Sequence, residues 1–217
     1  MSQDPFPHIQ NVKFLVGARS MTQLPSTGYP EIAIAGRSNV GKSSLLRVLV
    51  NQRSLVRVSR TPGRTREINY FLLESKDLPP LYLVDLPGYG YASVPMSLKE
   101  DWGDFVSRYL ETRPQLRAVL LLVDARREIT EVETQFADWM QGRGVRVQIV
   151  VTKIDKVPKT QWGQVEAQIR AAFGPDYARC VFYSSLKAIG NEDVWRKVKS
   201  AIGPAAGPTP DPAPVTP

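Results

Sequence analysis

Residues 36–43 read Gly-Arg-Ser-Asn-Val-Gly-Lys-Ser, which is the pattern G-x-x-x-x-G-K-S. The apolar run 32–35 before it predicts a buried strand, and residues 44–50 after it predict a helix. In a strand–loop–helix unit, such glycines let backbone N–H groups turn inward on an anion, and the helix N-terminus adds partial positive charge. The pattern therefore predicts a phosphate-binding loop, in which Lys42 faces the β- and γ-phosphates and the Ser43 hydroxyl ligates Mg²⁺.

Length and composition narrow the class of protein. A chain of 217 residues with 42% hydrophobic residues suits one large domain or two small ones. Apolar runs are too short to cross a bilayer, and the N-terminus lacks a secretory pattern. Cys180 and His8 are the only residues of their kinds, which excludes an internal disulfide and a histidine-based metal site or triad. We expect a cytoplasmic monomer that does not act at a membrane.

The net charge of +7 is unevenly distributed along the chain. No acidic residue occurs between Ile32 and Arg66. The same span carries Arg37, Lys42, Arg47, Arg53, Arg57, Arg60, Arg64 and Arg66. Nucleotide phosphates account for Lys42, and the remaining cations fit either a face that binds nucleic acid or an ordinary solvated surface.

Apolar runs and amphipathic stretches alternate along the chain. The runs predict strands at about 12–16, 31–35, 68–73, 81–85, 118–124, 145–151 and 181–183. The intervening patterns predict helices, one of them starting at a capping box formed by Thr130 and Glu133. This order predicts an α/β fold with a mostly parallel sheet, a first strand at its edge, and helices on both faces. We expect a flexible N-terminus over 1–11, one domain over 12–202, and a disordered Pro-rich tail over 203–217.

Further motifs follow the ends of the predicted strands, where such sheets bind ligands. Asp85-Leu86-Pro87-Gly88 can hold the Mg²⁺ shell with its carboxylate and approach the γ-phosphate with the Gly88 N–H. Thr152-Lys153-Ile154-Asp155 ends in a carboxylate, which only accepts hydrogen bonds and therefore suits the adjacent N1–H and N2–H₂ donors of guanine. The Lys153 stem can cover the base plane. Backbone N–H groups near Ser185 could bind guanine O6.

These motifs occur in the order and rough spacing of a Ras-like GTPase. Together, GRSNVGKSSL, TPGRT, DLPGYGYA, TKIDK and SSLKAIG resemble the EngB family of bacterial ribosome-biogenesis GTP-binding proteins, over about residues 10 to 202. The resemblance implies a Ras-like P-loop G domain with a mostly parallel sheet of about six to seven strands and one antiparallel edge. It also implies a slow GTPase switch that serves assembly of the large ribosomal subunit and is linked to cell division and septation.

The resemblance assigns roles to residues of this sequence. Lys42, Thr65 and Gly88 act in GTP hydrolysis, and Ser43, Thr65 and, through water, Asp85 hold Mg²⁺. Thr61 is the nearby alternative to Thr65. The phosphates and the first switch segment involve Gly36, Arg37, Ser38, Asn39, Val40, Gly41, Lys42, Ser43, Ser44, Gly63, Arg64, Thr65, Arg66 and Glu67. The second switch and the guanine loops comprise Asp85, Leu86, Pro87, Gly88, Thr152, Lys153, Ile154, Asp155, Tyr183, Ser184 and Ser185.

Two departures from the wider GTPase pattern carry expectations of their own. Thr152 replaces the usual Asn, which predicts a looser tie between the guanine loop and the phosphate loop. Tyr89 stands where Ras-like proteins carry the glutamine that orients water, so we expect slow intrinsic hydrolysis that rises on the ribosomal partner. Asn39 matches the loop asparagine of K⁺-stimulated GTPases, which suggests K⁺ as a further cofactor.

The expected partner is the large ribosomal subunit or its precursor, whose rRNA the arginines of residues 53–66 would contact; no DNA partner is expected. Two other interpretations stay open at this point. One is a P-loop kinase of a nucleoside or small molecule, which would not need Asp155. The other is an RNA-binding module with a vestigial nucleotide site. A membrane-remodelling GTPase is disfavoured, because no lipidation motif or amphipathic anchor is visible.

Overall fold

The structure is a computed structural model that describes residues 6–50, 67–89, 98–177 and 180–203. Its strands are β1 (Ile9–Ala18), β2 (Glu31–Gly36), β3 (Ile68–Ser75), β4 (Leu81–Asp85), β5 (Leu116–Asp124), β6 (Arg146–Thr152) and β7 (Val181–Phe182). Its α-helices are α1 (Lys42–Leu49), α2 (Leu98–Thr112), α3 (Glu131–Gly142), α4 (Trp162–Phe173) and α5 (Asn191–Ile202). Short 3-10 turns are η1 (Met21–Gln23), η3 (Ile154–Lys156), η4 (Lys159–Gln161) and η5 (Pro175–Tyr177).

The strands form one sheet in the order β1-β3-β4-β2-β5-β6-β7. Pairing is parallel from β4 through β2, β5 and β6 to β7, and antiparallel between β3 and both of its neighbours. The predicted α/β fold with a mostly parallel sheet and one antiparallel side is therefore confirmed. β4, β2, β5, β6 and β7 point the same way, so their carboxyl ends lie along one edge of the sheet.

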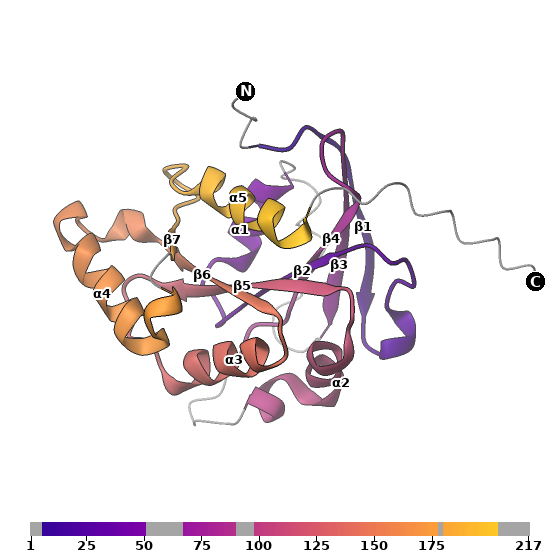
Figure 1. Ribbon diagram of the computed structural model, residues 1–217, viewed down its shortest axis with the longest axis horizontal. Helices are drawn as coiled ribbons and strands as arrows, with labels where there is room; N and C mark the ends of the chain where they lie inside the picture. The colour runs from indigo at the N-terminus through magenta and orange to yellow at the C-terminus, as the bar shows by residue number, and fades with distance from the viewer. Residues whose placement is uncertain (1–5, 51–66, 90–97, 178–179, 204–217) are drawn as a thin grey trace, which may run out of the picture.

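Two apolar cores cover the two faces of the sheet, because alternate residues of a buried strand point to opposite sides. On β2, Ala33 and Ala35 face one core while Ile32 and Ile34 face the other. The first core is closed by apolar residues of α2, α3 and α4, and the second by those of α1 and α5. Figure 1 shows this division, with α1 and α5 on one side of the sheet and α2 and α3 on the other.

β1 forms the predicted edge of the sheet and is longer than expected. It begins at Ile9, ahead of residue 12, because its N-terminal part already pairs with β3 through Asn11 and Glu74. Register shifts between Ile9 and Asn11 and between Phe14 and Val16 interrupt the pairing. Such irregularities protect a free strand edge against pairing with another chain. Residues 204–217, where the Pro-rich tail was predicted, lie outside the described part of the chain.

A buried ion pair lies at the amino-terminal end of β2, away from the predicted site. The Glu31 side chain is fully buried and accepts hydrogen bonds from the hydroxyls of Tyr70 at 3.1 Å and Tyr109 at 2.9 Å. The Arg113 Nε–H donates to Glu31 Oε1 at 2.8 Å, and the terminal nitrogen lies 2.6 Å from the same oxygen and donates to the Pro25 carbonyl oxygen. Through the Glu31 carboxylate, these contacts connect β2, β3 and the end of α2.

We expect Arg113→Ala to lower the free energy of unfolding by about 3–5 kcal/mol, because it leaves the Glu31 carboxylate buried without a cation. Chemical denaturation at neutral pH measures this loss. The matched control is Arg196→Ala, which removes an exposed ion pair with Asp193 and should cost at most about 1 kcal/mol. If Arg113→Ala costs as little stability as the control, the Glu31–Arg113 pair is not the buried ion pair described above.

Candidate functional site

The phosphate loop has the predicted strand–loop–helix context. β2 ends at Gly36 and α1 begins at Lys42. Gly36 and Gly41 have φ angles of 149° and 121°, a region that side chains strongly disfavour. A Cβ at Gly36 would lie 2.8 Å from the Leu122 carbonyl oxygen and 2.9 Å from Val40, so the loop has no room for one. The first turn of α1 therefore starts at the loop, with free N–H groups suited to an anion.

Lys42 is the first residue of α1, and its side chain turns back to the start of the loop. Its ammonium donates to the Gly36 carbonyl oxygen at 3.2 Å. A Cβ at Gly88 would lie 2.9 Å from both Lys42 Nζ and Ser38 Oγ, so a side chain there would have to displace these two groups. Burial lowers the pKa of Lys42, and the nearby Asp85 charge partly offsets this effect. A half-buried ammonium with few partners fits a phosphate group.

Asp85 ends β4 beside Lys42 and is buried, with 8% of its surface exposed. Burial raises its pKa from the ordinary 3.8 to about 6, although the charge of Lys42 acts in the opposite direction. Within the described residues, Asp85 Oδ1 has no hydrogen-bond partner. A buried carboxylate oxygen in this condition fits the hydration shell of a divalent cation, as the sequence predicts for Mg²⁺.

The predicted guanine loop lies at the end of β6. The Ser184 hydroxyl donates to Asp155 Oδ1 at 2.6 Å, and Lys156 Nζ lies 3.7 Å from Asp155 Oδ2. The hydrogen bond from Ser184 is the main reason why the pKa of Asp155 is lowered. The Ile154 N–H donates to the Tyr183 carbonyl oxygen at 3.2 Å. The segments after β6 and β7 therefore form one unit that presents an ionised carboxylate.

Thr152 ties the guanine loop to the phosphate loop. Its hydroxyl lies 2.7 Å from the Val40 carbonyl oxygen and 3.1 Å from that of Val123, and its one proton can serve either acceptor. The tie that the sequence predicts to be looser than with Asn is therefore present in this structure. The short Thr152 side chain reaches the phosphate loop because the two loops are close together. A Cβ added at Gly41 would lie only 3.8 Å from the Thr152 side chain.

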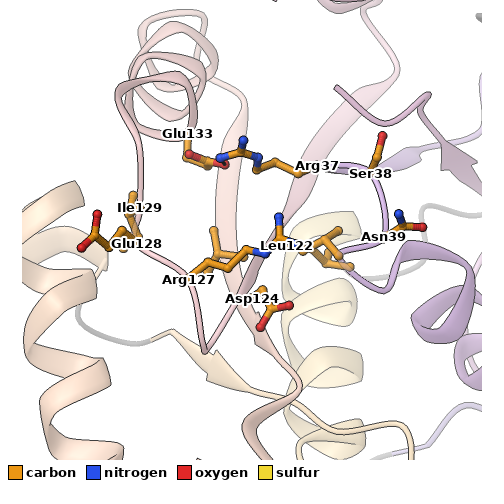
Figure 2. A pocket seen from close by; sticks show the side chains of 11 residues that line it. Arg37, Ser38, Asn39, Leu122, Asp124, Arg127, Glu128, Ile129 and Glu133 are labelled. Atoms are coloured by element: carbon orange, nitrogen blue, oxygen red, sulfur yellow. Dashed lines mark ion pairs between the residues drawn. The ribbon is translucent and has the colours of Figure 1, made fainter. Parts of the chain in front are cut away.

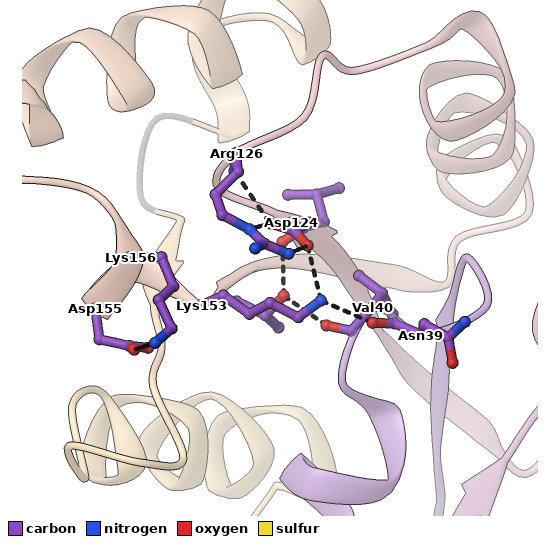
Figure 3. Close-up of polar contacts among 9 residues, drawn as sticks. Asn39, Val40, Asp124, Arg126, Lys153, Asp155 and Lys156 are labelled. Atoms are coloured by element: carbon purple, nitrogen blue, oxygen red, sulfur yellow. Dashed lines mark hydrogen bonds and ion pairs between the residues drawn. The ribbon is translucent and has the colours of Figure 1, made fainter.

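Asp124 completes the site and was missed by the sequence analysis. It ends β5, and Lys153 Nζ donates to its Oδ2 at 2.8 Å and to the Asn39 carbonyl oxygen at the same distance. Figure 3 shows Lys153 between Asp124 and the phosphate loop, with Arg126 on the other side of Asp124. Burial acts to raise the pKa of Asp124, but hydrogen bonds from Arg126 and Lys153 hold it well below its usual range. The available signal was an acidic residue that closes an apolar strand.

A small pocket separates the phosphate loop from the start of α3 (Figure 2). The Arg37 guanidinium points into it toward Glu133, with 3.9 Å between the charged atoms. Glu133 also accepts the Thr130 N–H at 2.9 Å, which confirms the predicted capping box of α3. Arg37 therefore directs its side chain to α3, and its backbone remains part of the phosphate loop.

Comparisons with known proteins agree with this geometry. Residues 31–153 match a family model described as a 50S ribosome-binding GTPase. Over 199 residues the chain is 44% identical to the GTP-binding protein EngB of Geobacter metallireducens, which covers 92% of this chain and 95% of that protein. The chain belongs to the EngB family of GTP-binding proteins. EngB of Clostridioides difficile is 40% identical over 191 residues, covering 88% of this chain and 92% of that one.

Solved structures share the fold of this EngB-family chain. A crystal structure of an EngB protein superposes with a TM-score of 0.60 at 22% identity, over 79% of this chain and 98% of that one. Era in complex with MgGDPNP and nucleotides 1506–1542 of 16S ribosomal RNA superposes with a TM-score of 0.65 at 20% identity, over 84% of this chain and 59% of that one. Family membership implies binding of GTP and GDP and hydrolysis of GTP.

Tyr89, which replaces the glutamine of Ras-like proteins, is buried in this EngB-family chain. Only 1% of its surface is exposed, and its ring belongs to the core formed by α2, α3 and α4. The Ser38 N–H donates to the Tyr89 carbonyl oxygen at 3.0 Å, and Arg37 and Tyr89 form a parallel bridge. Its backbone thus adjoins the phosphate loop while its ring packs in the core.

Several predicted residues contribute through packing or lie beyond the described ranges. Leu86, Ile154 and Tyr183 are buried, so they support the loops that carry them. The described part of the chain also includes the predicted site residues Ser43, Ser44, Pro87 and Ser185, which follow the carboxyl ends of the strands. Glu67 pairs with Arg19 at 2.5 Å, whereas Gly63, Arg64, Thr65 and Arg66 fall outside the described residues. Among the helices of the described ranges, none has the length and apolar character needed to cross a membrane.

We predict that the stability of the nucleotide-free protein, relative to an Asp85→Asn variant, falls as the pH rises through the interval between the unfolded and folded pKa values of Asp85. The folded pKa is raised, so the folded state binds the extra proton there and loses that advantage as the proton leaves. The difference should reach at most about 3 kcal/mol between pH about 4 and about 7. Denaturation of both proteins across this interval measures it, and parallel profiles would contradict the buried carboxylate.

Proposed function

We propose that this chain is a slow GTPase switch that binds Mg²⁺ and a guanine nucleotide and acts in assembly of the large ribosomal subunit. The proposal includes a link to cell division and septation and a cytoplasmic location. The observation that carries it is the Asp155 carboxylate at the end of β6, which the Ser184 hydroxyl orients through a hydrogen bond of 2.6 Å. Membership of the EngB family supports the nucleotide and the hydrolytic activity.

Purine choice follows from the hydrogen-bonding capacity of Asp155. A carboxylate offers acceptors only, and guanine offers the adjacent N1–H and N2–H₂ donors that match it. Adenine has no such pair and would leave the carboxylate unsatisfied, at a cost of about 1–3 kcal/mol. This discrimination distinguishes the proposal from a P-loop kinase that uses ATP.

The phosphate end combines Lys42, the phosphate loop and the residues suited to Mg²⁺. Ser43 and Thr65 would hold the ion directly, and Asp85 would hold it through water. The ion held by these residues would supply positive charge that offsets the negative charge developing on the phosphates. Lys42 stabilises the γ-phosphate, and the Gly88 N–H can approach it because Gly88 carries no side chain beside Lys42 and Ser38.

Slow hydrolysis follows from the place of Tyr89. Its ring is buried in the core, so the residue after Gly88 does not orient the attacking water as a glutamine would. A partner would then have to complete the site. K⁺ is a further proposed cofactor, because Asn39 matches the loop asparagine of K⁺-stimulated GTPases and adopts a left-handed backbone with φ of 64°.

The proposed partner is the large ribosomal subunit or its precursor. The basic span that ends at Arg66 suits rRNA phosphates, and contact through residues 53–66 would weaken steeply with salt. The description of the matching family model, a 50S ribosome-binding GTPase, supports the same partner. We propose that GTP orders this region for binding and that hydrolysis releases it, with the chain acting as a monomer.

The test of the nucleotide site is calorimetric titration with GTP, GDP and ATP, with and without Mg²⁺. We expect GTP and GDP to bind at least about tenfold more tightly than ATP, because of the donor pair that adenine lacks. Asp155→Asn should abolish most of this preference. Equal affinity for ATP and GTP would overturn the proposal.

The test of the partner is co-sedimentation with large ribosomal subunits, combined with GTP turnover in K⁺ or Na⁺ buffer. We expect binding with a non-hydrolysable GTP analogue, weak binding with GDP, and turnover that rises with subunits and with K⁺. Lys42→Ala should abolish nucleotide-dependent binding. Turnover that ignores the subunits would exclude the switch, equal rates in the two salts would exclude K⁺, and undiminished subunit binding by Lys42→Ala would favour an RNA-binding module.

A further inference from the structure

We propose that Asp124 is a positioning residue for guanine nucleotides and that it acts through Lys153. Asp124 belongs to none of the sequence motifs described above. It ends β5, which lies between β2, the strand before the phosphate loop, and β6, the strand before the guanine loop. The inference rests on the proposed guanine site, since it concerns a residue that prepares that site.

Arg126 contacts both oxygens of the Asp124 carboxylate, and Lys153 contacts one of them. Oδ1 accepts the backbone N–H of Arg126 at 3.1 Å and the Arg126 Nε–H at 3.0 Å. Oδ2 accepts the Arg126 terminal nitrogen at 2.9 Å and Lys153 Nζ at 2.8 Å. The side chain is 4% exposed, so these contacts form largely out of water. Oδ1 thus closes the turn after β5, and Oδ2 holds the lysine.

Lys153 is consequently fixed at both ends. Its backbone has the left-handed φ of 57°, and its ammonium joins Asp124 Oδ2 to the Asn39 carbonyl oxygen. A free lysine side chain samples many rotamers and would lose that freedom when a base packs on it. With both contacts in place, the aliphatic stem spans the gap between the end of β6 and the phosphate loop before any nucleotide arrives (Figure 3). Binding then costs less ordering.

The charge of Asp124 is essential to this arrangement. Without Asp124, the Lys153 ammonium would keep only the Asn39 carbonyl oxygen, which is a neutral acceptor. Because the Lys153 side chain is 31% exposed, water can replace that acceptor. The carboxylate adds a charge-assisted hydrogen bond, roughly twice as strong as a neutral one. Arg126 cannot replace Asp124 as the charged partner of Lys153, because Arg126 is itself a cation and pairs with the same carboxylate.

A purely structural role for Asp124 makes a different prediction. Closing the turn after β5 needs only the acceptor at Oδ1. Asp124→Asn can keep that acceptor as its amide oxygen and replaces Oδ2 by an NH₂ group, which cannot accept the Lys153 proton. This substitution therefore keeps the backbone hydrogen bond that closes the turn and removes the two contacts at Oδ2, from Lys153 and from the Arg126 terminal nitrogen; the Lys153→Met background isolates the lysine contact.

The experiment measures affinities of the full chain for GDP, GTP and inosine diphosphate, which lacks the 2-amino group. We expect Asp124→Asn to weaken all of them alike, by about tenfold. The preference for GDP over inosine diphosphate should persist, because Asp155 and Ser184 are untouched. In a Lys153→Met background, Asp124→Asn should have no further effect. The melting temperature, and the matched control Asp193→Asn on the exposed face of α5, report on folding.

Unchanged affinity, or an equal loss in the Lys153→Met background, would overturn the inference. A loss of the preference for GDP over inosine diphosphate would also overturn it, because it would mean that the guanine loop had collapsed. If Asp124→Asn does not fold, Asp124→Thr is the second variant, since its hydroxyl can still accept the Arg126 N–H. Failure of the native chain to prefer guanine nucleotides would instead overturn the proposed function and is measured independently.

Discussion

The side chains of Thr152 and Lys153 join the guanine loop to the phosphate loop, and the rest of the site depends on this connection. The Thr152 hydroxyl reaches the Val40 carbonyl oxygen and the Lys153 ammonium reaches that of Asn39. Both acceptors are backbone atoms of the loop that follows β2. The parallel order β2-β5-β6 places the two loops on the same edge of the sheet, with the end of β5 between them. The spacing between the guanine loop and the phosphate loop is thereby set by the sheet and by two hydrogen bonds.

Electrostatics differ between the two ends of the sheet. At the amino-terminal end of β2, the buried Glu31 carboxylate is satisfied by Arg113, Tyr70 and Tyr109. At the carboxyl edge, Asp85 keeps one buried oxygen without a partner in the described part of the chain, and burial lowers the pKa of Lys42. Folding alone does not favour unpaired buried charge, whereas a ligand of opposite charge relieves it. The first network stabilises the domain, and the second pair fits the nucleotide and the cation proposed for this site.

Tyr89 connects the phosphate loop to the core. Its carbonyl oxygen accepts the Ser38 N–H while its ring packs among the residues of α2 and α3. A side chain in that position cannot leave the core without exposing a large apolar surface. The segment after Gly88 is therefore coupled to core packing, in contrast to a polar residue that could turn freely toward the γ-phosphate. This coupling is the structural basis for the proposed dependence of hydrolysis on a partner.

Local patterns in the sequence were enough to determine most of the fold and of the nucleotide site. The spacing of Gly36, Gly41, Lys42 and Ser43 identifies the phosphate loop, because few other loops need those residues at those intervals. The apolar runs that become β4 and β6, each ended by a motif, predict where Asp85 and Asp155 lie. Periodicity cannot reveal contacts between side chains far apart in the chain. Only the tertiary structure decided that Thr152 keeps the tie to Val40, that the Tyr89 ring is buried, and that Asp124 holds Lys153, because each depends on which strands are neighbours.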